Sequence, residues 1–527
     1  MPGPHAPDEA ERSSGAPGGG AGGPRHRRRR APRRRHRVRR ALLVAGAVLL
    51  IAVASVVGYN WHLFNQIHTV TVKGLSAEGT AAEFGTENIL MVGSTDRCDL
   101  PKSDPLYQDC LQGHTGINSD VVMILHLVPA TKQVSVLSIP RDTFVPNARA
   151  EGANKIDAAL AEGPSQLVAA IEDDFGIPIQ HYVELNFASF ANVVQTIGGI
   201  HMYFPEPVYD GQVGLDVPSP GCIYLNGGDA LKLVRSRELQ YKGPGVTTDN
   251  PVDWTRETQN DLARIQRDHE FLRVLATAVA HNGLGNPIPD ERLVASVAPQ
   301  LEVDAAFKGQ LLGLASTFHA VNPNGVPQLT LPVRAPDIPV DYIYRGGDYG
   351  EIVYPTAIED ANVIDQFLGV SSGTDTMTGR PLPSPKSITV SVLNGTGVTD
   401  QAADTGTALS ALGFRIGTLG DTAPVGAPAE TLVTYASPAD ESAAEAVARS
   451  LSGLVVMARG ATAGGSQVTV TTGSDFSVDS APRAAPSTTS TTSAPTVTTG
   501  VALASASPSV SPLAPWDPRA CGSQKKG

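Results

Sequence analysis

Basic and acidic side chains recur beside apolar segments in the middle of the chain, and their types suit phosphate chemistry. Arginine offers a planar fork for paired contacts with phosphate oxygens, and Mg²⁺ typically binds one or two carboxylates together with substrate phosphates. The candidates are Asp120 in NSD, Arg141 and Asp142 in IPRD, Lys155 in NKID, and Arg235 and Arg237 in VRSRE. Together they predict a phosphoryl-transfer site, with Asp120 on the metal and the arginines on phosphate.

Two further groups have a plainer interpretation beside the functional one. Gly93–Asp96 (GSTD) is expected to be a small-residue loop after a strand, and Asp96 is a second candidate metal ligand, although a simple turn explains it equally well. Arg264, Arg267 and Asp268 share one face of a predicted helix. The two arginines are candidate substrate-binding residues, and an ordinary ion-pair ladder is the alternative.

These residues need a rigid support, and the surrounding pattern predicts one. Apolar strands over 121–127 and 133–139 flank a short turn, which favours an antiparallel hairpin that ends at Pro140 and Arg141. Helical patterns cover 164–176 and 255–281. Mixed strands and helices predict a layered α/β domain over 86–335.

The N-terminus has a different character. Residues 1–40 contain 12 arginines and three acidic residues, although the whole 527-residue chain has a net charge of −12. Residues 41–59 carry no charge and are long enough to span a membrane, with a cleavable signal peptide as the alternative. The flanking arginines predict a single-pass protein of the cell membrane, N-terminus cytoplasmic and C-terminus extracytoplasmic. Contact with membrane lipid is favoured for the arginine run over nucleic acid, which is not expected as a partner.

The remaining boundaries follow from composition. A stalk is expected over 60–85, and a connecting segment that ends in a linker over 336–387. Alternating strand and helix patterns predict a small α/β domain over 388–477, and the Ser/Thr/Pro-rich residues 478–527 are expected to be disordered.

The chain has four cysteines, and their spacing carries no metal signature. Cys98 and Cys110 flank a polar loop that a disulfide between them could staple. Cys222 and Cys521 have no obvious partner.

Several motifs resemble the LytR-CpsA-Psr family when taken in order over about 86–285. They are NILMVGSTDR, NSDVVMILHL, VSVLSIPRDTFVPNA, NKIDAAL, GIPIQHYVELNFASFANVVQTIGGI, LNGGDALKLVRSRELQY and DLARIQRDHEFLRVL. A basic tail before one span is the usual family arrangement. VSVLNGTG and ALGFRIG resemble the LytR C-terminal domain that actinobacterial members often carry.

The resemblance implies an α-β-α fold with a mixed central sheet and a Mg²⁺-dependent activity that moves a glycopolymer from a polyprenyl-pyrophosphate carrier to peptidoglycan. Arg141, Arg235 and Arg237 would grip the pyrophosphate with help from Lys155, and Asp120 would bind Mg²⁺. The lipid would enter an apolar tunnel, for which the helix bearing Phe187, Phe190 and Val194 is a candidate, although core packing explains those residues at least as well.

The chain departs from the family pattern at three positions. Thr95 stands where an aspartate usually follows GS, so the register of Asp96 toward the metal is uncertain. Asn118 replaces an arginine, and Asp268 replaces a neutral amide.

Two other functions stay open at this point. A pyrophosphatase that only hydrolyses the lipid carrier needs the same residues, and a non-catalytic wall-binding or regulatory protein needs no chemistry at all. The identity of the glycopolymer is not written in the sequence.

Overall fold

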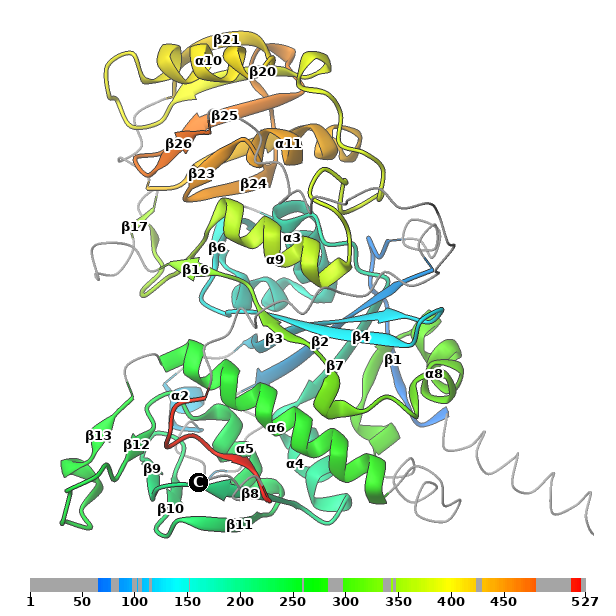
Figure 1. Cartoon of the computed structure of the whole chain (residues 1–527), viewed down its shortest axis with the longest axis vertical. Coiled ribbons are helices and arrows are strands. Elements are labelled where there is room, and N and C mark those ends of the chain that lie inside the picture. The colour runs from blue at the N-terminus through cyan, green and yellow to red at the C-terminus, as the bar shows by residue number, and fades with distance from the viewer. Residues whose placement is uncertain are drawn as a thin grey trace, which may run out of the picture. The chain divides into compact units, whose positions relative to one another are not determined.

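The computed structural model (Figure 1) describes twelve stretches of the chain: residues 65–76, 85–96, 102, 107–112, 116–150, 152–257, 260–282, 297–334, 343–344, 347–422, 429–479 and 513–522. The basic tail over 1–40 and the predicted span over 41–59 lie outside these residues. Among the helices that are described, none combines the length and the apolar character that crossing a membrane requires.

A seven-stranded sheet forms the centre of the larger domain. Its order is β1 (His68–Val70), β14 (Glu302–Asp304), β7 (His181–Asn186), β2 (Glu87–Asp96), β3 (Ile117–Val128), β4 (Gln133–Ile139) and β15 (Gln328–Thr330). β2, β3 and β4 are antiparallel neighbours, whereas β7 runs parallel to β2 and β15 runs parallel to β4. The predicted mixed sheet and the predicted hairpin are therefore both confirmed.

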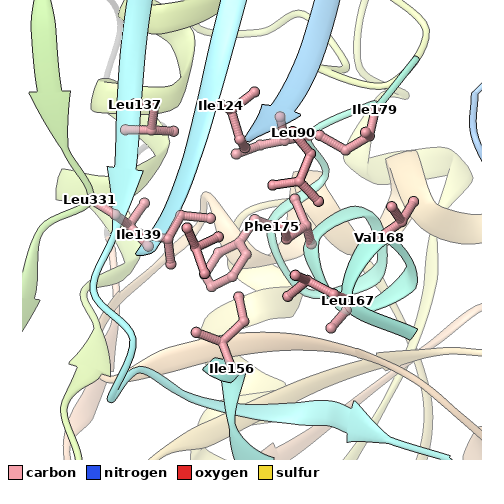
Figure 2. Packing of buried hydrophobic residues seen from close by; sticks show 14 of the residues in the cluster. Leu90, Ile124, Leu137, Ile139, Ile156, Leu167, Val168, Phe175, Ile179 and Leu331 are labelled. Carbon is pink, nitrogen blue, oxygen red and sulfur yellow. The ribbon is translucent and has the colours of Figure 1, made fainter. Parts of the chain in front are cut away.

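The sheet is apolar on both faces, because alternate residues of each strand point to opposite sides. On one face Leu90, Ile124 and Leu137 pack against helix α3 (Pro164–Phe175) and helix α9 (Ala357–Leu368), as Figure 2 shows in part. The other face packs against α8 (Ala305–Phe318). Helices on both sides of a buried sheet keep the strand ends in fixed positions.

Most predicted elements agree with the structure to within a few residues. Helix α3 begins at Pro164 and is followed by Gly176, whose φ of 63° is the left-handed cap conformation that glycine adopts without strain. Helix α6 (Asn260–Asn282) begins later than the predicted 255, because Thr255–Arg256 pair with Gln240–Tyr241 as strands β13 and β12.

The connecting segment over 336–387 is more structured than a linker. It contains α9, whose Val363, Ile364 and Phe367 belong to the main apolar cluster of the larger domain. The sequence analysis assigns no helix to this connecting segment, and the helical pattern of 357–368 was not recognised.

A second group of elements packs beside α6. It comprises α4 (Phe187–Thr196), α5 (Gly227–Arg235), β8 (Ile200–Phe204), β11 (Gly221–Leu225), and the strands β9 (Val208–Asp210) and β10 (Leu215–Val217). Phe190 of α4 meets Phe271 of α6 with ring centroids 5.4 Å apart. Val194 is fully buried in the same apolar cluster.

The last described residues, 513–522, return to this group and form what we call the C-terminal strap. Arg519–Ala520 pair with β8 as strand β27, and the Trp516 ring stacks on Tyr241 with centroids 3.9 Å apart. A disulfide joins Cys521 to Cys222 on β11, across 299 residues of sequence. The prediction of disorder over the whole of 478–527 was therefore wrong for this segment.

The other predicted disulfide is only half described. Cys110, in helix α2 (Tyr107–Leu111), is disulfide-bonded, and Cys98 lies outside the described residues.

The smaller C-terminal domain has a five-stranded sheet of its own. The order is β21 (Arg415–Asp421), β20 (Thr389–Asn394), β25 (Val468–Thr472), β22 (Thr431–Tyr435) and β24 (Val455–Arg459), with helices α10 (Gln401–Ala411) and α11 (Glu441–Ala448) packed on it. The strands and helices that were predicted for a small α/β domain are present. β21 and β24 were not predicted.

Glu172 on α3 predicts a pH-dependent stability. Its carboxylate accepts hydrogen bonds from the Ile179 backbone N–H and the Ser76 hydroxyl, but burial raises its pKa to about 7. The Glu172 carboxyl stays protonated in the folded protein between pH 4.5 and 7, whereas it is ionised in the unfolded chain. Stability therefore falls as pH rises through that window. Glu172→Gln keeps both hydrogen bonds without the charge. We expect its advantage over wild type to grow by about 2 kcal/mol between pH 5 and pH 8 in urea unfolding. A pH-independent difference would contradict this assignment.

The disulfide of the C-terminal strap predicts a second stability effect. Changing Cys222 and Cys521 together to serine should lower the free energy of unfolding by about 2–5 kcal/mol, because the cross-link restricts the unfolded chain and holds β27 on β8. Peptide mapping of the unreduced protein should recover a fragment containing both cysteines. Separate fragments would show that the bond does not form.

Candidate active site

A β-bulge in β3 presents Asp120 to the site. Gly93 pairs with Val121 and Ser94 pairs with Ser119, so Asp120 has no partner across the ladder. A bulge of this kind re-aims the extra side chain. Gly93 permits the close approach, since a Cβ there would lie 2.9 Å from the Cβ of Val121. The predicted loop over 93–96 is thus the continuation of β2, and Asp120 lies within a strand rather than before one.

Asp120 is held on three sides. The Thr95 hydroxyl donates to its Oδ2 at 2.5 Å, Arg141 Nη1 donates to its Oδ1, and Arg264 Nη2 donates to its backbone carbonyl at 2.8 Å. Burial alone would raise the pKa of this carboxyl, but Arg141 and Arg264 lower it by more. The pKa of Asp120 therefore lies below its ordinary value. Asp120 is thus ionised at neutral pH. Thr95 supports this carboxylate from the position where the family pattern has an acid.

Arg141 stands on a backbone that neighbouring segments fix. Pro140 ends β4, and its carbonyl accepts hydrogen bonds from the N–H and the hydroxyl of Thr143, at 3.1 and 2.6 Å. The Asp157 N–H donates to the Arg141 carbonyl, and the Val353 N–H donates to the carbonyl of Asp142. The charged end of this apolar strand is a rigid turn.

Asp142 lies at the centre of a second ion-pair group. Lys155 Nζ donates to Oδ1 at 3.0 Å and Arg237 Nη2 donates to Oδ2 at 2.9 Å, while Arg141 Nε lies 3.6 Å away. Burial raises the pKa of Asp142, but these cations, Arg141 above all, bring it below the ordinary value. Both oxygens are occupied and the group is a weak base. Asp142 therefore orients cations.

Arg237 is positioned by the loop that follows α5. Asp210 accepts from the Ser236 hydroxyl at 2.7 Å and from the Glu238 backbone at 3.1 Å, and Arg267 Nη2 donates to the Ser236 carbonyl at 2.7 Å.

Arg267 itself is not among the ion pairs at Asp120 and Asp142. It is 1 % exposed, and its Nη1 pairs with Glu257 at 2.6 Å and with Asp517 of the C-terminal strap at 3.4 Å. Its Nη1 and Nη2 are thus bound within the protein, and contact between Arg267 and substrate stays a prediction. Arg267 acts as a structural tie between α6, the Arg237 loop and the strap.

Arg235 is the last residue of α5 and is 6 % exposed. Its guanidinium carbon lies 5.2 Å from the centre of the Phe187 ring, which is a cation–π geometry. The structure thus brings Arg235 against the helix that was the candidate for the lipid tunnel.

Two further acids balance the arginines. Asp261 pairs with Arg264 at 2.8 Å and lies 3.5 Å from Arg237, and Asp268 lies 3.9 Å from Arg264. Both oxygens of Asp261 and of Asp268 are buried without a hydrogen bond among the described residues. Burial raises the pKa of Asp268 to about 7.

Four arginines have a buried Nε–H that makes no hydrogen bond within the described part of the chain: Arg141, Arg237, Arg264 and Arg267. The first three belong to the groups around Asp120 and Asp142. The carboxylates paired with these Nε atoms lie 3.5–3.9 Å away. Phosphate oxygens are suited to such unsatisfied guanidinium donors.

Asp157 was not recognised from the sequence. It is 7 % exposed, and burial raises its pKa to about 6 despite the opposing effect of Arg141. Its motif, NKID, drew attention only to Lys155, which ends β6 (Gly152–Lys155) and precedes the 3₁₀ helix Ile156–Glu162. The signal that was missed is an acid two residues after Lys155, which the fold also brings within the influence of Arg141.

Binding of a hard divalent cation at this site stays a prediction. Asp120 is ionised, and Asp261 offers carboxylate oxygens that lack hydrogen bonds. Asp96 ends β2 opposite Ile117, and its contact with a metal stays a prediction.

Comparison with known families gives two matches. The family model described as "LytR_cpsA_psr family" matches residues 65–354, and the model described as "LytR cell envelope-related transcriptional attenuator" matches residues 387–476.

Three individual relatives are 25–34% identical to this chain over the aligned residues. The probable cell wall biosynthesis protein LcpB of Corynebacterium glutamicum is 34% identical over 203 residues, which are 38% of this chain and 44% of LcpB. The cell wall biosynthesis protein LcpA of the same organism is 25% identical over 418 residues, covering 72% of this chain and 75% of LcpA. The polyisoprenyl-teichoic acid–peptidoglycan teichoic acid transferase TagU of Oceanobacillus iheyensis is 28% identical over 171 residues, 31% of this chain and 52% of TagU. The alignments thus span about half of LcpB and TagU or less.

Among solved structures, a LytR-Csp2A-Psr enzyme from Actinomyces oris matches with 24% identity and a TM-score of 0.41, covering 51% of this chain and 89% of that one. Bacillus subtilis TagV matches with 21% identity and a TM-score of 0.40, covering 55% of this chain and 99% of TagV.

Arg267→Ala tests the structural role of this arginine. The change leaves Glu257 and Asp517 buried without their counter-ion, so we expect a loss of about 3–5 kcal/mol in the free energy of unfolding. The loss should be smaller at pH 5 than at pH 8, because protonation neutralises the two abandoned carboxylates. Urea unfolding at both pH values measures it. Arg256→Ala, whose ion pair with Glu238 is exposed, is the control and should cost about 1 kcal/mol or less.

Proposed function

We infer the function from one premise: this chain belongs to the LytR_cpsA_psr family. We propose that it is a membrane-anchored transferase of cell-wall glycopolymer. The donor is a glycopolymer on a polyprenyl-pyrophosphate carrier and the acceptor is peptidoglycan. The relatives support the general class, because LcpA is named a cell wall biosynthesis protein and TagU a peptidoglycan teichoic acid transferase.

One observation carries the proposal: three arginines with unsatisfied Nε–H donors, Arg141, Arg237 and Arg264, are tied to two ionised aspartates, Asp120 and Asp142. A pyrophosphate supplies the acceptors that these donors lack. The negative charge of the pyrophosphate also suits these arginines. The carboxylate beside each Nε lies 3.5–3.9 Å away and makes no hydrogen bond with it.

The reaction replaces the phosphoanhydride bond of the pyrophosphate by a phosphoester bond to the acceptor sugar. The 6-hydroxyl oxygen of a muramoyl sugar attacks the phosphorus nearest the glycan, and the bond from that phosphorus to the bridging oxygen breaks. Polyprenyl phosphate leaves with the electron pair and takes up the proton that the hydroxyl loses.

Each residue has a defined part in that step. Arg141 and Arg237 bind phosphate oxygens and stabilise the charge that develops on them, Lys155 keeps Asp142 in place, and Arg264 holds Asp120 from behind. A Mg²⁺ ion bound by Asp120 would neutralise part of the pyrophosphate charge. Arg235, which lies over the Phe187 ring, would bind the pyrophosphate together with Arg237.

Arg141→Ala tests the proposal in the full chain, incubated with a polyprenyl-pyrophosphate-linked glycan, Mg²⁺ and purified peptidoglycan. We expect release of polyprenyl phosphate to fall by about 100-fold or more, as for the loss of a donor to developing charge. Arg273→Ala, nine residues beyond Arg264 on α6, should keep wild-type activity.

The same assay separates the alternatives. Equal lipid phosphate release by wild type and Arg141→Ala would refute the mechanism. Release without glycan on the recovered peptidoglycan would identify a pyrophosphatase. Glycan attachment that persists after Arg235 and Arg237 are both changed to alanine would favour a binding role.

A further inference from the structure

Three buried acids come together away from the candidate active site. Glu441 and Glu445 lie one turn apart on α11, and Asp375 lies in the segment that leads into the C-terminal domain. One carboxylate oxygen from each lies within 4.8 Å of the others. The three residues are only 4–6 % exposed, so water does not screen their repulsion.

Arg449, which carries the positive charge beside this cluster, also pairs with a fourth carboxylate. Arg449 donates to Glu445 Oε1 through Nε and Nη2, but its Nη1 and Nη2 also form a bidentate pair with Asp365 at 2.8 and 2.6 Å. One arginine therefore faces four carboxylates in this cluster. Like charges one turn apart on a helix destabilise it unless a cation lies between them.

The orientation of two of the acids is fixed by donors. Asp375 accepts from the N–H groups of Met377 and Thr378 at 2.9 and 3.1 Å, and Glu445 Oε2 accepts from the Thr376 N–H at 3.2 Å.

Glu441 is different, and it supplies an observation independent of the clustering. Its side chain is buried and faces the other two carboxylates, yet its Oε1 has no hydrogen-bond partner among the residues that the structure describes. A buried carboxylate oxygen without a donor is costly unless something binds it.

We propose that Asp375, Glu441 and Glu445 form a Ca²⁺ site that fastens the connecting segment to helix α11. The ligands are all carboxylate oxygens, as hard cations prefer, and Ca–O bonds of about 2.3–2.6 Å let opposite ligands lie about 5 Å apart. Mg²⁺ requires opposite ligands about 4 Å apart in a stricter octahedron, so it binds this set less well.

A cavity lies beside the cluster. Its lining includes Glu445 and Thr376 together with Asp174 and Asp360, so two further buried carboxylates lie next to the proposed site.

The site has a structural consequence. Thr376, next to Asp375, donates its hydroxyl to the Gly176 carbonyl at 2.6 Å at the end of α3. A cation on Asp375 therefore ties α11 to a segment that is itself bonded to the larger domain.

Calorimetric titration of the chelator-treated full chain with CaCl₂ at pH 7.5 tests the proposal. Asp120→Asn removes the candidate catalytic cation ligand and should still bind one Ca²⁺ at the cluster. Glu441→Gln and Asp375→Asn should each lose that Ca²⁺, and Glu359→Gln, an exposed acid on α9, should bind as wild type does. MgCl₂ in place of CaCl₂ should bind more weakly at the cluster.

Thermal unfolding gives a second measurement that does not depend on activity. Ca²⁺ should raise the Tm of wild type and of Asp120→Asn but not that of Glu441→Gln. In chelator, Glu441→Gln should melt at or above the wild-type temperature, which shows that it folds. Unchanged Ca²⁺ binding by Glu441→Gln and Asp375→Asn would overturn the proposal, and so would a wild-type Tm that ignores Ca²⁺.

Discussion

The ion pair between Asp120 and Arg141 is the interaction on which the site depends. It joins a bulge in β3 to the end of β4, so two neighbouring strands of one sheet each contribute one charge. The strands beneath are apolar on both faces and packed between helices, which leaves the pair little freedom to move. Arg264 then links the same aspartate to α6, and Asp142 links Arg141 to Lys155 and Arg237.

This arrangement solves a problem that any cluster of arginines creates. Guanidinium groups placed together repel one another, and without a ligand they would turn toward solvent or force the fold apart. Asp120, Asp142 and Asp261 act as internal counter-ions that hold the arginines in register. A phosphate-bearing ligand then meets donors that are already oriented, so little reorganisation is required on binding.

The sequence predicts the parts of this site that depend on local pattern. The hairpin, the end of β4 and the position of Arg141 follow from alternating apolar residues and Pro140. The bulge at Asp120 does not, because a shift of pairing by one residue depends on how β2 and β3 meet. The role of Arg267 was missed for a similar reason: its partners Glu257 and Asp517 are distant in sequence, and spacing on a helix says nothing about them. The pairing of Cys222 with Cys521 is likewise a property of the folded chain, since 299 residues separate them.

That disulfide turns the chain between the two cysteines into a covalent ring. The ring includes α6, the connecting segment and the whole C-terminal domain. A protease that cuts one peptide bond anywhere inside it produces two fragments that stay joined through sulfur. The C-terminal domain is therefore joined covalently to the larger domain at both of its ends, and a single cut on either side of it does not release it.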